Sequence, residues 1–232
     1  MTHLTQVIFD FATVARLRLH DSYDWHQAVW QAFPGRDGER REFLTRLDRR
    51  REGFRLLMVS PTPPVRPDWC PKDAESWKTK PVPETYFRRS RYAFQLCANP
   101  TKKVAGKLDG TVTKNGRRVP LSKREELVEW MNRKGEQGGF TVDEATLRTF
   151  SRGREYFEKN GQQGLHSAVE FQGVLTVTDP AKFHDTFTRG IGSAKAFGFG
   201  LLVIAPIAQG RSETTERSTT REAKQSVLSN AA

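Results

Sequence analysis

The sequence predicts an α+β protein made of two tandem βαββαβ units, of which the N-terminal one is the more degenerate. In the second half, segments patterned as strands and helices follow one another as strand, helix, strand, strand, helix, strand. The first half begins in the same order, and a chain of 232 residues is long enough for two small domains. This order is typical of the ferredoxin-like (RRM-like) fold. Because that fold serves many functions, function must be argued from the sites.

The first unit opens with a strand and a helix. The apolar run within 4–11 predicts a buried strand. Asp21 or Ser22 can cap the helix that follows, and Pro34-Gly35 ends it. Apolar side chains recur at helical spacing between these signals, at Trp25, Ala28, Val29, Ala32 and Phe33.

A hairpin and a proline-rich stretch complete the first unit. Segments 41–47 and 54–60 are short and partly apolar, and the basic turn 48–53 between them suggests a hairpin. Seven prolines fall within 61–83, which predicts a loop or linker with a short element near Trp77. The second helix and last strand of this unit would have to lie in that stretch.

The second unit begins with a half-buried strand at 91–98, where Tyr92, Phe94 and Leu96 alternate with other residues. Ser122 and Glu125 have the spacing of a capping box, which predicts a helix that ends at the glycines of 135–139.

Two strands, a helix and a last strand are then predicted. The strands are expected at 145–151 and 168–178, with a polar, basic excursion between them. Asp179-Pro180 starts a helix that Gly190 ends, and 199–205 is an apolar strand. We therefore expect domains at 1–84 and 85–209 and a disordered tail at 210–232, where periodicity is lost.

Charge is the clearest functional signal of the composition. There are 38 Lys and Arg against 27 Asp and Glu, a formal net charge of +11. The excess favours a nucleic-acid partner, although solvated charged faces would give the same composition. Basic residues cluster along the whole folded part, at Arg40-Arg41, Arg49-Arg50-Arg51, Arg88-Arg89-Arg91, Lys102-Lys103, Arg117-Arg118, Lys123-Arg124, and Arg152 with Arg154.

Several other classes of protein are not expected. No apolar run reaches the roughly 18 residues of a membrane span, and the polar start does not resemble an export signal. Cys70 and Cys97 are isolated, which argues against a zinc site or a disulfide framework. No trio of acidic residues has two-metal spacing. We expect a cytoplasmic protein with no metal, cofactor or membrane partner.

His26 and Tyr23 are the candidate catalytic residues. They lie three residues apart at the start of the first predicted helix, so that an imidazole and a phenol can face one pocket. The alternative is that Tyr23 packs against the linker while His26 points to water.

A glycine-rich segment between the last helix and the last strand is a candidate binding loop. Glycine allows a backbone to approach a phosphate closely, and Lys195 adds charge. The spacing matches neither phosphate-loop motif, and a tight helix-to-strand turn would explain the glycines equally well. The candidate residues are Gly190, Gly192, Ser193, Lys195, Gly198 and Gly200.

The excursion that carries Arg152, Arg154 and Lys159 is a candidate RNA-binding arm. A basic hairpin can enter a nucleic-acid groove and contact phosphates. A solvated hairpin is the alternative.

Together these residues resemble a known family. The segments Asp21-Ser22-Tyr23-Asp24-Trp25-His26, Val59-Ser60-Pro61, 92–102, 171–180 and 189–202 are similar, in order and spacing over residues 4–207, to CasE-type CRISPR-repeat endoribonucleases of the type I-E Cascade complex. The glycine-rich segment is the most specific of them.

The resemblance implies two ferredoxin-like domains and a metal-independent cut at the base of a repeat hairpin in precursor CRISPR RNA. It implies that the mature crRNA is retained with the other Cascade subunits. It also implies that Tyr23 and His26 form the catalytic pair, that the loop from Gly190 to Gly200 binds RNA, and that Arg152 and Arg154 belong to a groove-reaching hairpin. Lys102 and Lys159 are further candidate RNA contacts.

The chemistry agrees with the residues. A ribose 2′-OH can attack its own adjacent phosphate, which leaves a 2′,3′-cyclic phosphate and a 5′-hydroxyl. An imidazole titrates near neutral pH, whereas a phenol stays protonated and can donate a proton or orient a group. Which of the two is acid or base stays open. The competing hypothesis is a non-catalytic RNA-binding or scaffold subunit of a ribonucleoprotein complex.

Overall fold

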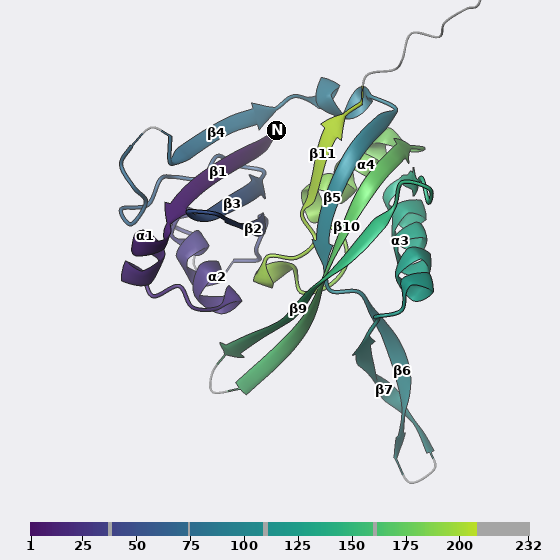
Figure 1. The fold of residues 1–232 in the computed structure, drawn as a ribbon. Coiled ribbons are helices and arrows are strands. Elements are labelled where there is room, and N and C mark those ends of the chain that lie inside the picture. Colours follow the sequence, from purple (N-terminus) through teal and green to yellow (C-terminus); the bar gives the residue numbers. More distant parts are fainter. Residues whose placement is uncertain (37–38, 74, 109–110, 160–161, 208–232) are drawn as a thin grey trace, which may run out of the picture.

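The computed structural model describes residues 1–36, 39–73, 75–108, 111–159 and 162–207. Two antiparallel sheets lie side by side, one built from each half of the chain (Figure 1). The predicted tail at 210–232 lies outside the described residues.

The N-terminal sheet has the strand order β2-β3-β1-β4, and all its neighbouring strands are antiparallel. The helices α1 (Phe11–Arg16) and α2 (Ser22–Trp30) cover one face, where Trp25 and Val29 pack against Val7 and Phe9. The strands are β1 (Thr2–Asp10), β2 (Leu44–Arg50), β3 (Gly53–Ser60) and β4 (Trp77–Val82).

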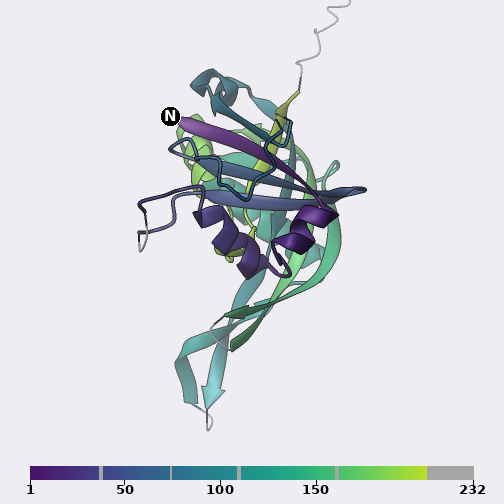
Figure 2. The ribbon, with the colours of Figure 1, turned by 90° about the vertical axis from the view of Figure 1, so that its left-hand side faces the viewer.

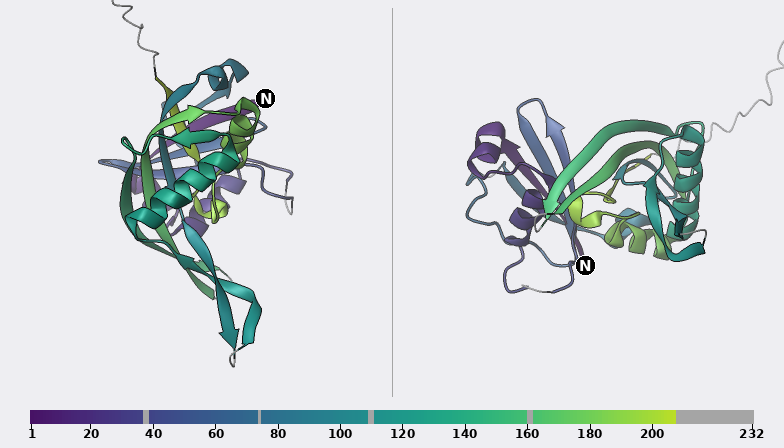
Figure 3. Two further views of the ribbon diagram at one scale, coloured as in Figure 1. Left: turned by 90° about the vertical axis from the view of Figure 1, so that its right-hand side faces the viewer. Right: turned by 90° about the horizontal axis from the view of Figure 1, so that it is seen from below.

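The C-terminal sheet has the order β11-β5-β10-β8, and β9 pairs with β10. The helices α3 (Arg124–Gly138) and α4 (Pro180–Arg189) contribute Trp130 and Phe183 to its core, and Figure 3 shows α3 lying across the sheet. The strands are β5 (Arg91–Ala98), β8 (Phe140–Val142), β9 (Arg148–Lys159), β10 (Gln162–Val177) and β11 (Leu202–Pro206).

The two sheets share a buried core. Leu57 and Val59 of β3 belong to the same cluster of buried side chains as Leu202 and Ile204 of β11. The short 3-10 helix η1 (Glu84–Arg88) links the two halves, and its Phe87 lies in this cluster. The halves are therefore held together by apolar burial as well as by the chain itself.

Two hairpins leave the body on the same side (Figures 1 and 2). One is formed by the distal parts of β9 and β10 and is called the β9–β10 arm below. The other is formed by β6 (Thr101–Leu108) and β7 (Thr111–Pro120), which pair only with each other.

Most predicted elements are confirmed. The strand at 4–11, the helix capped at Asp21, the hairpin of β2 and β3, and the strand at 91–98 are all present. The helix from Pro180 to Gly190 is also present, with the Asp179 side chain accepting from the Ala181 and Lys182 amides.

Several local expectations were wrong. Helix α3 begins at Arg124 after Lys123, so Ser122 does not form the predicted capping box. The strand predicted at 145–151 begins only at Arg148, because 143–147 form a hydrogen-bonded turn. The strand predicted from 199 begins at Leu202, since Gly200 still has a φ of +87°. The β6–β7 hairpin and α1 were not anticipated.

Of the helix and the strand expected in the proline-rich stretch 61–83, its described residues form only the strand. Strand β4 occupies its end and pairs with β1, where Pro81 lies opposite His3. Among the described residues between β3 and β4, no helix forms. The N-terminal sheet is therefore covered by helices from one connection only.

Candidate active site

A cavity of about 370 Å³ lies where the two halves of the molecule meet. Helix α2 contributes Trp25 and His26 to its wall, and β2 contributes Thr45 and Arg49. The root of the β9–β10 arm and residues 196–199 of the glycine-rich segment also line it, as do residues 19–22, β3 and β5. The cavity therefore exists only when both halves are folded and docked.

The start of α2 is firmly fixed by its capping interactions. The Asp21 carboxylate accepts from the amides of Tyr23 (2.8 Å) and Asp24 (2.9 Å). In return, the Asp24 carboxylate accepts from the Asp21 amide, which completes a capping box. With Trp25 buried in the core below, His26 is directed to the edge of the cavity.

The half-buried His26 ring is held by aromatic neighbours. The indole N–H of Trp30, one turn further along α2, donates to Nε2 of His26 at 3.0 Å. Nε2 is therefore an acceptor, which places the proton of the neutral ring on Nδ1. The Phe43 ring lies 6.1 Å from the imidazole, centroid to centroid. These contacts orient the imidazole at the edge of the cavity.

Tyr23 lies on the same turn of α2 and is half-buried. Of the described residues that line the cavity, His26 is one and Tyr23 is not. The two predicted catalytic side chains are thus neighbours on one helix, but they do not share this cavity.

The glycine-rich loop is closed by backbone hydrogen bonds. The Ile191 amide donates to the Gly200 carbonyl (2.9 Å), and the Gly200 amide donates to Cys97 of β5 (2.8 Å). A Cβ at Gly200 would lie 2.5 Å from the Ile191 carbonyl oxygen, so only glycine fits there. Of the other predicted loop residues, Gly198 lines the His26 cavity, and the Ser193 hydroxyl donates to the Asn99 carbonyl (3.3 Å).

Four predicted basic residues lie on the β9–β10 arm or the glycine-rich loop. Arg152 lines the His26 cavity at the root of the arm, and Arg154 is exposed further out. Lys159 ends strand β9. Lys195 lies on the η2 turn (Lys195–Phe197) but lines a neighbouring cavity rather than that of His26.

Lys102 is separate from this group. It lies on β6, and its ammonium pairs with Glu126 of α3 at 2.6 Å. The structure therefore places it at the base of the other hairpin.

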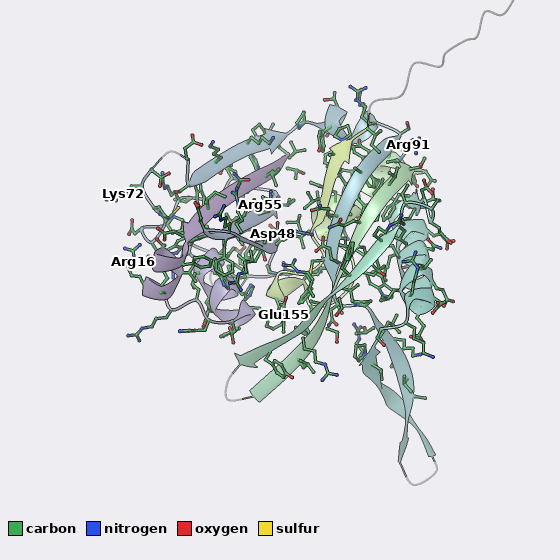
Figure 4. The ribbon with its side chains drawn as sticks, in the orientation of Figure 1. Arg16, Asp48, Arg55, Lys72, Arg91 and Glu155 are labelled. Carbon is green, nitrogen blue, oxygen red and sulfur yellow. The ribbon has the colours of Figure 1, made fainter. Side chains whose placement is uncertain are left out.

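A buried cluster of charges, missed by the sequence analysis, ties the arm to the N-terminal sheet. Arg46, only 4% exposed, bonds Asp48 (2.8 Å) and Glu170 of β10 (2.9 Å). Arg55 pairs with Asp48 at 2.7 Å, and Arg152 lies 3.4 Å from Glu170. Figure 4 shows Asp48 and Arg55 on the N-terminal sheet.

The cluster favours the ionised form of the Asp48 carboxyl. Burial alone would raise the pKa of Asp48, but Arg46 and the hydrogen bond from Arg55 keep that pKa below its ordinary value. No local signal identifies the cluster, because Arg46 and Glu170 are 124 residues apart.

Glu155 also lines the cavity, close to where the arm leaves the body (Figure 4). Burial raises the pKa of its carboxyl above the ordinary 4.5, while Arg152 opposes this effect. The folded protein therefore binds this proton more tightly than the unfolded chain does. This contribution to stability is complete below pH 4.5 and is lost as the pH rises through the folded-state pKa.

Glu155→Gln is accordingly expected to raise the melting temperature relative to the native chain as the pH increases. Thermal melts of both proteins from about pH 4 to pH 7 would check this. Equal pH dependence in the two proteins would show that the Glu155 carboxyl titrates normally.

The described residues form neither a cluster of metal ligands nor a membrane-spanning helix. No three His, Cys, Asp or Glu side chains in this part of the chain gather as metal ligands would. Likewise, no helix formed by the described residues is both long and apolar enough to cross a membrane.

Comparison with known proteins identifies the family. The sequence profile of a family described as "CRISPR associated protein" matches residues 2–206. The CRISPR system Cascade subunit CasE of Escherichia coli (strain K12) is 34% identical over 199 residues, which is 84% of this chain and 96% of that protein. The chain belongs to the CasE/Cse3 family. This membership confirms the resemblance found in the sequence.

Further CasE/Cse3 proteins match over nearly their whole length. The CRISPR-associated endoribonuclease Cse3 of Thermus thermophilus is 33% identical over 218 residues, 88% of this chain and 99% of that protein. The crystal structure of Cas6e from E. coli K-12 matches with a TM-score of 0.67 at 30% identity, covering 89% of this chain and 100% of that one. The structure of T. thermophilus Cse3 bound to an RNA that represents a pre-cleavage complex matches at 0.65 and 30%, covering 88% and 99%.

Proposed function

We propose that this CasE/Cse3 protein is an endoribonuclease that binds the repeat hairpin of precursor CRISPR RNA and cuts it once at the hairpin base. The observation that carries the proposal is the position of His26, at a cavity walled by the glycine-rich loop and the root of a basic arm. The names of its relatives support it, since Cse3 is an endoribonuclease and has been solved bound to RNA.

The reaction proceeds by attack of a ribose 2′-OH on the adjacent phosphate and needs no metal. One group removes the proton from the 2′-OH, another protonates the leaving 5′-oxygen, and cations stabilise the phosphorane. The products carry a 2′,3′-cyclic phosphate and a 5′-hydroxyl. A bond forms between the 2′-oxygen and phosphorus, and the bond from phosphorus to the 5′-oxygen breaks. One proton leaves the 2′-OH and one is added to the 5′-oxygen, so the reaction consumes no proton overall.

His26 exchanges one of these protons, and Tyr23 donates to or orients the substrate. In the free protein, Trp30 occupies Nε2 of His26, so that substrate binding has to displace the indole or use Nδ1. Arg49 and Arg152 line the same cavity and supply positive charge next to the imidazole. Tyr23 would reach the RNA from outside the cavity.

The β9–β10 arm with Arg152, Arg154 and Lys159, together with the glycine-rich loop, holds the RNA stem. Both hairpins project from one side of the body, and Lys102 lies at the root of the second (Figure 1). After the cut, the mature crRNA stays bound, and the complex joins the other Cascade subunits in the cytoplasm. CasE of E. coli is named as such a subunit.

We also infer that residues 1–84 and 85–209 are two ferredoxin-like domains. In both sheets the first and third strands of the unit are central, with orders β2-β3-β1-β4 and β11-β5-β10-β8. The absence of a helix among the described residues between β3 and β4 makes the first domain the degenerate one.

A cleavage assay in EDTA tests the proposed reaction. Purified protein is incubated with the host repeat hairpin in excess EDTA, and the product ends are identified. A single cut with a cyclic phosphate and a 5′-hydroxyl is expected, since no step needs a metal. Cleavage that EDTA stops would overturn the mechanism, and tight binding without any cut would favour the scaffold subunit instead.

A further inference from the structure

We propose that a second, basic cavity next to the His26 cavity binds the phosphates of the single-stranded RNA that flanks the hairpin. This inference rests on the proposed function, because it extends the path of the same RNA. The cavity has a volume of about 690 Å³ and is lined by Arg40 and Arg41, which precede β2, and by Arg189 and Lys195.

The cavity has a strong excess of positive charge. Glu42 is the one acidic residue among the described residues that line it, and its carboxylate is already paired with Arg36 at 2.7 Å. Arg189 pairs with Asp185 of its own helix at 2.6 Å. For Arg40, Arg41 and Lys195, no described carboxylate lies within ion-pair distance.

The cations of the cavity are held close enough to repel one another. Burial lowers the pKa of Lys195, and the charges of Arg41, Lys134, Arg189 and Arg40 lower it further. The Lys195 ammonium donates to the Arg189 carbonyl at 2.7 Å, which holds it at the cavity. Like charges gathered in this way destabilise the free protein, and a bound anion relieves the repulsion.

The basic cavity lies close to the candidate active site. Phe43 lines it, and the same ring lies 6.1 Å from the imidazole of His26. Lys195 faces the basic cavity, whereas the next residues of the loop, 196–199, face the His26 cavity. A strand that passes His26 and crosses the glycine-rich loop therefore enters the basic cavity.

The chemistry of the lining suits an unpaired strand. Guanidinium groups bind phosphate oxygens in a bidentate manner, and single strands are held by cationic grooves that carry aromatic rings. The cavity offers the guanidinium groups, and that of Arg41 is held in place by the buried Phe43, whose ring lies 5.7 Å away and whose carbonyl accepts from it. In the proposed function, the RNA stem is bound by the β9–β10 arm, on the other side of the glycine-rich loop.

The test compares three RNAs made uncleavable by a 2′-deoxy sugar at the scissile position: the stem-loop alone, and the stem-loop with a flank of about six nucleotides on its 5′ or its 3′ side. In fluorescence anisotropy, the native protein should bind one flanked RNA about tenfold more tightly than the stem-loop. The double variant Arg40→Gln/Arg189→Gln should lose this gain and bind the stem-loop as the native protein does. The flank whose gain in affinity the double variant abolishes is the strand that occupies the cavity.

Salt dependence and a matched control complete the test. The slope of log K against log salt should fall by about 1.4 for the flanked RNA, since each single-strand phosphate contributes about 0.7. Lys72→Gln/Arg91→Gln removes the same charge at two residues that line neither cavity (labelled in Figure 4) and should change neither value. A native protein that gains nothing from either flank, or a variant equally weakened on the stem-loop, overturns this inference. Failure to bind any of the three RNAs would instead refute the proposed function.

Discussion

Replacing His26 with alanine is expected to slow cleavage of the repeat hairpin by about 10²- to 10⁴-fold while leaving RNA affinity nearly unchanged. The imidazole lines the cavity, and in the proposed reaction it exchanges a proton with the ribose or the leaving oxygen, whereas the proposed binding surface lies mainly on the arm and the loop. Single-turnover cleavage, measured alongside binding of the uncleavable RNA, separates the two quantities.

The loss must be distinguished from a folding defect. His26→Ala removes the acceptor of the Trp30 indole N–H, so a modest fall in melting temperature is expected in any case. His26→Gln offers that indole an acceptor but cannot exchange a proton near neutral pH, and it should be equally inactive. His184→Ala, which removes an imidazole that packs on Phe87 of η1, is the matched control and should cut normally. Near-native cleavage by both His26 variants would remove His26 from the mechanism.

Replacing Glu170 with leucine is expected to destabilise the protein by about 3–5 kcal/mol, the largest effect on stability among the changes considered. Glu170 is 5% exposed and accepts from Arg46, which is itself buried. Without Glu170, the Arg46 charge stays in the interior with Asp48 as its one remaining ion-pair partner among the described residues. Urea denaturation followed by tryptophan fluorescence would measure the change in the free energy of unfolding.

A double variant tests whether the cost comes from the unpaired charge. Arg46→Met/Glu170→Leu removes both charges and leaves Asp48 paired with Arg55 at 2.7 Å. It should therefore be more stable than Glu170→Leu alone, with a coupling energy of about 0.5–3 kcal/mol. Strictly additive effects would mean that the two side chains act independently and that the cluster does not join the halves energetically.

The sequence predicted best where local signals and burial coincide. The Asp21 cap, the apolar stripe of α2 and the turn at Gly190 are each complete within a few residues, so their elements were recognised. The Asp21 cap and this apolar stripe also placed His26 in the first turns of α2. A candidate catalytic residue could therefore be named before its surroundings were known.

The remaining features have no local signature. Among the described strands, β6 and β7 pair only with each other, so residues of this hairpin such as Lys102 and Lys103 need no apolar alternation, which is the pattern that predicts a strand. Strand β4 was obscured by Pro81, which a strand tolerates at the edge of a sheet. The basic cavity and the Arg46 cluster join segments that are more than a hundred residues apart, and only the fold brings them together.

The division of the His26 cavity between the two halves has a consequence for how the protein is made. His26 leaves the ribosome early, but the wall formed by residues 196–199 is translated much later. An incomplete nascent chain thus carries the imidazole without the surface that would hold a transcript beside it. Ribonuclease activity should therefore arise only after residues 196–199 have been translated, so that chains terminated before that point pose no threat to cellular RNA.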